Sequence, residues 1–151
     1  MLFRSQAVPW RQYLAVLQSE KALHKRRKQN VGVIVAAGDI FDGTQPSGTV
    51  GGDTLSRLLR DARFDDRIDA VVLRIDSPGG SMFAAEQVKR EVEALRAAGK
   101  PVVASMAGVA ASGGYYIAAS ADRIYAAPTT VTGSIGVYAI VPTFEIGRAH
   151  V

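Results

Sequence analysis

Two apolar runs, each followed by a glycine-containing turn and then a helix-like stretch, most constrain how this chain can fold. Residues 71–75 have the composition of a buried strand and lead through Asp-Ser-Pro-Gly-Gly-Ser, residues 76–81, into a stretch with helical periodicity, residues 82–98. Residues 101–106 are a second buried-looking strand, followed by the small-residue turn at 108–114. Because strands that alternate with helices favour a mostly parallel sheet, the pattern predicts the α/β class.

The other expected elements fit the same alternation. The chain has 151 residues, 48% of them hydrophobic, which suits one globular domain with a buried sheet. We expect strands at 31–37, 70–75, 102–106 and 123–126, and helices at 53–62 (capped by Asp53), 82–98 (ended by Gly99 and Pro101) and 112–120.

Ser112 is the candidate nucleophile. It lies in Gly-Val-Ala-Ala-Ser-Gly-Gly-Tyr-Tyr, residues 108–116, among side chains too small to shield its hydroxyl. A serine that attacks a carbonyl needs an exposed Oγ, nearby backbone N–H groups and room for a substrate backbone. The alternative is that Ser112 only caps a short helix, since Ser-Gly-Gly turns are common.

The Gly79-Gly80 turn is the candidate source of the N–H groups. A strand, a Gly-Gly turn and a helix start present unpaired N–H groups at one place, which would suit an oxyanion or a phosphate. Two parallel strands would bring this turn and Ser112 together at their carboxyl ends. That juxtaposition favours nucleophilic chemistry.

Four motifs together carry a family resemblance: the glycine turn at 76–81, Lys100-Pro101, the stretch 106–116 around Ser112, and Thr-Gly-Ser-Ile-Gly at 132–136. With them the chain resembles the signal peptide peptidase A (protease IV) family over about residues 31–144. The stretch 43–62, with Val-Gly-Gly-Asp-Thr at 50–54, is more similar to the carboxy-terminal repeat of the long form of that family. The resemblance implies a crotonase/Clp-like spiral of strand-turn-helix units, present here as an incomplete domain. It implies Ser112 as nucleophile, the N–H groups of Gly80 and Gly113 as oxyanion hole and Ser134 as the residue that orients the base.

The resemblance also implies what the whole protein does. It would be a serine endopeptidase that degrades cleaved signal peptides, without metal or cofactor, as a homo-oligomeric ring at the periplasmic face of the bacterial inner membrane. Its membrane anchor would lie outside this chain. A catalytically silent repeat that keeps the fold for oligomerisation is the alternative.

The general base is the part that the sequence does not supply. The family uses a Ser-Lys dyad, in which burial lowers the pKa of the lysine. No lysine follows Lys100, Lys89 belongs to a charged helix face, and Lys100 lies in a turn, so we expect neither to be the base. The two histidines, His24 and His150, do not match the position of a Clp-type triad histidine. We therefore expect the catalytic lysine to lie outside this chain.

Both ends of the chain depart from the family pattern. Residues 1–5 and 145–151 match translations of opposite strands of one sequencing adapter, so we exclude them from functional argument. We expect residues 6–30 to be a basic helical linker and residues 31–144 a partial peptidase domain.

Charge and composition exclude several other functions. The net charge is +4, but residues 1–30 carry 7 Lys or Arg against 1 Glu, and the remainder carries 11 against 13 acidic residues. Nucleic-acid binding by the core is therefore unsupported. The basic stretch could contact anionic lipid, although a solvated linker is the favoured interpretation. There is no cysteine, and no apolar run approaches the length of a membrane span.

Overall fold

The computed structural model describes residues 29–136, which belong almost entirely to the unit Val31–Val151. The expected linker, the adapter-like ends and both histidines lie outside the described residues. The elements in chain order are β1 (Val31–Ala37), β2 (Ile40–Phe41), β3 (Val50–Gly51), α2 (Gly52–Phe64), β4 (Ala70–Ser77), α3 (Met82–Ala97), β5 (Val102–Ala111), α4 (Gly113–Ala118), β6 (Arg123–Tyr125) and β7 (Val131–Gly133).

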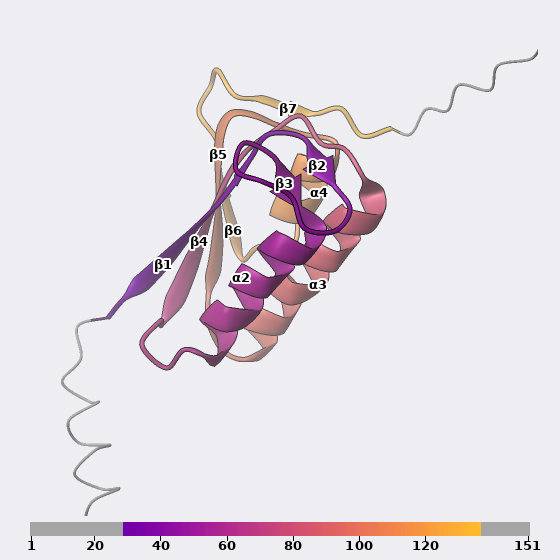
Figure 1. Cartoon of the computed structure of the whole chain (residues 1–151). Helices are drawn as coiled ribbons and strands as arrows, with labels where there is room; N and C mark the ends of the chain where they lie inside the picture. The colour runs from indigo at the N-terminus through magenta and orange to yellow at the C-terminus, as the bar shows by residue number, and fades with distance from the viewer. Residues whose placement is uncertain (1–28, 137–151) are drawn as a thin grey trace, which may run out of the picture. The chain divides into compact units, whose positions relative to one another are not determined.

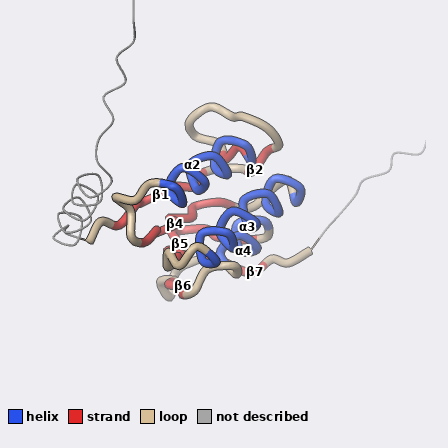
Figure 2. The backbone as a smooth tube through the Cα atoms, turned by 90° about the horizontal axis from the view of Figure 1, so that it is seen from below, coloured by secondary structure: helices blue, strands red, loops and turns tan. Residues whose placement is uncertain are grey.

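The main sheet is parallel throughout, with the order β1-β4-β5-β6 and with β7 paired to β5 beyond the end of β6. The helices α2, α3 and α4 lie on one face of it (Figures 1 and 2). The predicted α/β class and the spiral of strand-turn-helix units are confirmed.

The core forms between the helices and one face of the sheet. Alternate residues of β4, among them Leu73 and Ile75, point to the helices and are fully buried. They meet Leu59 of α2 and Val88 of α3, which are also fully buried. The other face of the sheet is less covered, and the β1 valines at 31, 33 and 35 are all more than half exposed.

The helix α2 differs in detail from the sequence prediction. Asp53 is not its cap: the N-cap is Gly51, no side chain bonds there, and Asp53 is the second helical residue. The first residue is Gly52, where a Cβ would lie 2.8 Å from the Ala84 Cβ of α3. Close approach of the two helices therefore sets where α2 begins.

The strand β5 continues well past its predicted end at Met106. Its register against β4 shifts, because Ile75 pairs with Met106 but Ser77 pairs with Ala110. Such a bulge bends the strand locally. The carboxylate of Asp76 accepts a hydrogen bond from the Val109 N–H inside the bulge at 3.0 Å. The extended strand ends immediately before Ser112.

Candidate active site

Ser112 occupies a sharp turn between β5 and α4. Its backbone has φ 49° and ψ −117°, a conformation that side-chain-bearing residues rarely adopt. Its hydroxyl makes no capping hydrogen bond to α4, so the structure does not support a cap as its role. Serine nucleophiles are found on strained strand-to-helix turns of this kind, because such turns expose Oγ.

The Gly79-Gly80 turn is held by β2. The Ile40 N–H donates to the Gly79 carbonyl at 2.8 Å, and the Ser81 N–H donates to the Ile40 carbonyl at 2.8 Å. In this parallel bridge the groups of Gly80 itself face away from β2. Gly80 has φ 145°, and a Cβ there would lie 2.1 Å from the Ile40 oxygen, so only glycine fits.

The glycine turn and Ser112 lie in direct contact. A Cβ on Gly79 would be 2.8 Å from both the Ser112 Cβ and the Gly113 nitrogen. A Cβ on Gly113 would lie 3.5 Å from the Gly80 nitrogen. Within residues 29–136, neither the Gly80 N–H nor the Gly113 N–H donates a hydrogen bond. For Gly113 this is expected, because the first N–H groups of a helix have no partner within the helix. Two unpaired donors therefore lie beside the serine.

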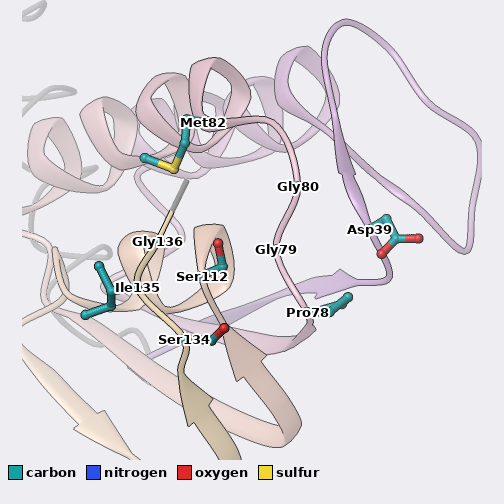
Figure 3. Close-up of a pocket in the computed structure, with 9 residues that line it drawn as sticks. All are labelled: Asp39, Pro78, Gly79, Gly80, Met82, Ser112, Ser134, Ile135 and Gly136. Atoms are coloured by element: carbon teal, nitrogen blue, oxygen red, sulfur yellow. The ribbon is translucent and has the colours of Figure 1, made fainter. Parts of the chain in front are cut away.

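Ser134 lies next to Ser112 because β7 pairs with the end of β5. Ala111 is opposite Gly133, and the Ser112 N–H donates to the Gly133 carbonyl at 2.8 Å. Ser134 also has a positive φ, 50°. Figure 3 shows both serines at the wall of one pocket, across from the Gly79-Gly80 turn.

The pocket has a volume of about 830 Å³ and opens at the carboxyl ends of the strands. Its lining includes residues that the sequence analysis did not assign to the site: Asp39, Pro78, Met82, Ile135 and Gly136. Met82 and Ile135 make part of the wall apolar, and Asp39 is the charged side chain among the lining residues. The sequence could have indicated all of these except Asp39, because Pro78 and Met82 flank the Gly79-Gly80 turn and Ile135 and Gly136 follow Ser134.

Neither described lysine is placed to act as the base. The Lys100 Nζ donates to the carbonyls of Ala62 and Asp65, both at 2.8 Å, where α2 ends. Lys89 pairs with Glu93 at 2.9 Å, and the hydrogen bond to Glu93 raises the pKa of Lys89. A base that works near neutral pH needs a lowered pKa. Among residues 29–136, those that line the pocket include no lysine and no histidine.

Among residues 29–136, no group of three His, Cys, Asp or Glu side chains lies close enough together to hold a metal ion. The described helices also include none that is long and apolar enough to cross a membrane.

Comparisons with known proteins find proteases. The chain is 53% identical to Protease 4 of Salmonella typhi over 115 residues, which are 76% of this chain and 19% of that protein. It is 40% identical to the chloroplastic serine protease SPPA of Arabidopsis thaliana over 147 residues, 95% of this chain and 21% of that protein. The chain thus spans about a fifth of the length of these relatives.

A solved structure agrees with these matches. The 1510-N membrane-bound stomatin-specific protease, as its S97A mutant, superposes with a TM-score of 0.60 at 25% identity, over 80% of this chain and 54% of that one. The fold defines the class as a domain of the strand-turn-helix spiral type, the architecture that this solved protease also has. Residues 94–147 match the model of peptidase family S49, and the chain belongs to that family.

Proposed function

We propose that this chain is part of a serine endopeptidase that works through an acyl-enzyme on Ser112. The observation that carries the proposal is the contact between the Gly79-Gly80 turn and Ser112, beside two unpaired backbone donors. Membership of peptidase family S49 supports the same chemistry.

In the proposed mechanism, the Ser112 Oγ attacks the carbonyl carbon of the scissile peptide bond. The N–H groups of Gly80 and Gly113 stabilise the negative charge that develops on the carbonyl oxygen, since both donors are already oriented before the reaction. The attack needs a base that takes the serine proton and later gives a proton to the leaving amine. We assign that role to a lysine outside this chain, with Ser134 orienting its amine.

The proposed substrates are cleaved signal peptides. Such peptides are apolar, and Met82 and Ile135 give the pocket wall apolar surface on which a hydrophobic side chain could be buried. The missing Cβ atoms at Gly79 and Gly80 leave room for the substrate backbone beside Ser112.

The proposed cellular setting is the periplasmic face of the bacterial inner membrane, with an anchor outside this chain. We assign residues 31–144 to the carboxy-terminal repeat of the long family form, working in a homo-oligomeric ring. Support for assembly comes from the exposed β1 valines and from β1 itself, which is an edge strand of the sheet formed by residues 29–136.

A catalytically silent repeat of the same fold is the second candidate. It is favoured by one observation, that the described residues lining the pocket include no lysine and no histidine. In that case the domain would contribute only to assembly.

The two candidates are separated by assaying the complete protein with an apolar peptide. We expect turnover that Ser112→Ala abolishes. The control Ser105→Ala, at a serine on the strand β5 that precedes Ser112, should leave turnover within about threefold of the wild type. Turnover that survives Ser112→Ala would refute Ser112 as the nucleophile. No turnover in the wild-type protein would favour the silent repeat.

A further inference from the structure

The motif Thr-Gly-Ser-Ile-Gly at 132–136 begins with a threonine to which the proposed catalysis assigns no role. Thr132 is the middle residue of β7 and lies opposite Ala110 of β5, two residues before Ser112. Its hydroxyl donates a hydrogen bond to the Ala110 carbonyl at 2.7 Å. A side chain of the short strand is thus bonded to the backbone of the strand that leads into Ser112.

Burial contributes little to holding β7 in place. The strand has three residues, and within the described part of the chain none of them is buried. Val131 is 61% exposed, whereas Ala110 on the opposite strand is fully buried. Because little apolar surface of β7 is removed from water, its position depends on its hydrogen bonds to β5.

The Thr132 hydroxyl adds a bond that the backbone of β7 cannot supply. A threonine hydroxyl has one proton to donate. The Met106 sulfur lies 3.6 Å from the same oxygen, but the Ala110 carbonyl is much closer and is the stronger acceptor. Since branching at Cβ restricts χ1 of threonine, the hydroxyl is held toward β5 at a small cost in side-chain entropy.

The residues that follow Thr132 reach the candidate active site. The Gly133 carbonyl accepts the Ser112 N–H at 2.8 Å, and Ser134 lines the pocket beside Ser112. Both serines have a positive φ, 49° and 50°, which residues with a side chain rarely adopt. Such conformations persist only where the surrounding contacts hold them. The Thr132 bond is one of those contacts.

We propose that Thr132 is a positioning residue for acyl transfer, whose hydroxyl fixes β7 against the end of β5. Gly133 then holds the backbone of Ser112, and Ser134 lies at the pocket wall. The inference rests on the proposed role of Ser112 as the nucleophile. A displacement of about 1 Å at a reacting group can cost about 100-fold in rate, so a loosened β7 would slow the attack while every reacting group is still present.

Thr130 provides a matched control in the same segment. Its hydroxyl donates to the Ala107 carbonyl of β5 at 2.8 Å and accepts the Ala127 N–H at 3.1 Å. Loss of this hydroxyl should therefore destabilise the fold at least as much as loss of the Thr132 hydroxyl. Ala107 lies at the far end of the bulge from Ser112. If Thr132 contributed only to stability, the Thr130 variant would be at least as slow.

The test measures acylation of the complete protein by an activated apolar ester in stopped-flow kinetics. The variants are Thr132→Val, which keeps the side-chain shape without the hydroxyl, Thr132→Ser, which keeps the hydroxyl, and Thr130→Val. We expect Thr132→Val to slow acylation by about 10-fold, and the other two variants to stay within about threefold of the wild type. Equal slowing by the two valine variants, or no rescue by serine, would overturn the proposal.

Hydrogen–deuterium exchange of the same proteins gives a readout that does not need turnover. Because the Gly133 carbonyl protects the Ser112 N–H, we expect this amide to exchange about 10-fold faster in Thr132→Val and less than about threefold faster in Thr130→Val. Unchanged exchange in Thr132→Val would overturn the proposal even if acylation slowed. If the wild-type protein is not acylated on Ser112, the proposed function fails, and the exchange measurement alone decides whether Thr132 holds Ser112 in place.

Discussion

At the scale of single residues, Ser112 lines a pocket and has a strained backbone conformation. A residue with a side chain at φ 49° and ψ −117° is held there by its surroundings, here by the Ser112 N–H bond to Gly133 and by the start of α4. Strain of this kind persists at functional sites because the position of the side chain is required.

The strain can be measured by substitution. Ser112→Gly removes the Cβ that makes this conformation costly, so we expect the free energy of unfolding to rise by about 1 kcal/mol. Ser112→Ala keeps the Cβ and is the matched control, with little expected change. Urea denaturation of the two variants checks this, and equal stabilities would show that Ser112 stores no strain.

Ser134 gives the second prediction at this scale. It lines the pocket beside Ser112, and we infer that it orients the amine of the base. In the complete protein, Ser134→Ala should slow acylation by about 10- to 100-fold, as loss of an orienting contact does. Pre-steady-state kinetics with an apolar ester measure this step, and wild-type rates in the variant would refute the role.

At the scale of elements, polar side chains tie the strands and helices in register. The Asp122 carboxylate accepts a hydrogen bond from the Val102 N–H at 2.8 Å, at the start of β5, and one from the Arg96 Nε at 2.7 Å, at the end of α3. The bond from Val102, followed by that from Arg96, lowers the pKa of Asp122 below its ordinary value of 3.8.

This contact predicts a dependence of stability on pH. Because the pKa of Asp122 is lower in the folded than in the unfolded chain, its contribution is complete above about pH 5 and is lost as the pH falls through the folded pKa. We therefore expect the urea midpoint to fall more steeply between pH 5 and about 3 in the wild type than in Asp122→Asn. Parallel curves for the two proteins would contradict the assigned contact.

At the scale of elements, the sequence predicts some boundaries of strands and helices and misses others. The strand 31–37 is confirmed at both ends, and helix 82–98 ends within one residue of its prediction, since apolar periodicity and Gly99 mark its limits. The bulge in β5 could not be predicted, because it depends on the Asp76 side chain bonding across to Val109. The short strands β2 and β7 depend on tertiary contacts with the Gly79-Gly80 turn and with β5.

For the site, the sequence indicated Ser112, Gly80, Gly113 and Ser134 as candidates. The structure brings Gly80, Ser112 and Ser134 to the lining of one pocket, and Gly113 lies next to Ser112 and close to Gly80. Their proposed roles stay predictions. Asp39 was not anticipated, since nothing in its local sequence indicates that the chain folds it toward Ser112, whereas Ile135 directly follows the candidate Ser134.

At the scale of the whole molecule, we propose that this chain supplies a nucleophile and an oxyanion hole but not the base. Removal of one member of such a catalytic unit typically costs about 10⁴-fold or more in rate. We expect the 151-residue chain alone to show no turnover of apolar peptides above background. Turnover abolished by Ser112→Ala in this chain would contradict the prediction.

The most direct test is to map where an acyl group forms. The complete protein and the 151-residue chain are each incubated with an activated apolar ester, quenched in acid, digested and analysed by mass spectrometry. We expect an acyl adduct on Ser112 in the complete protein and none in the 151-residue chain. An adduct on a different residue of the complete protein, or equal acylation of Ser112 in both, would contradict it.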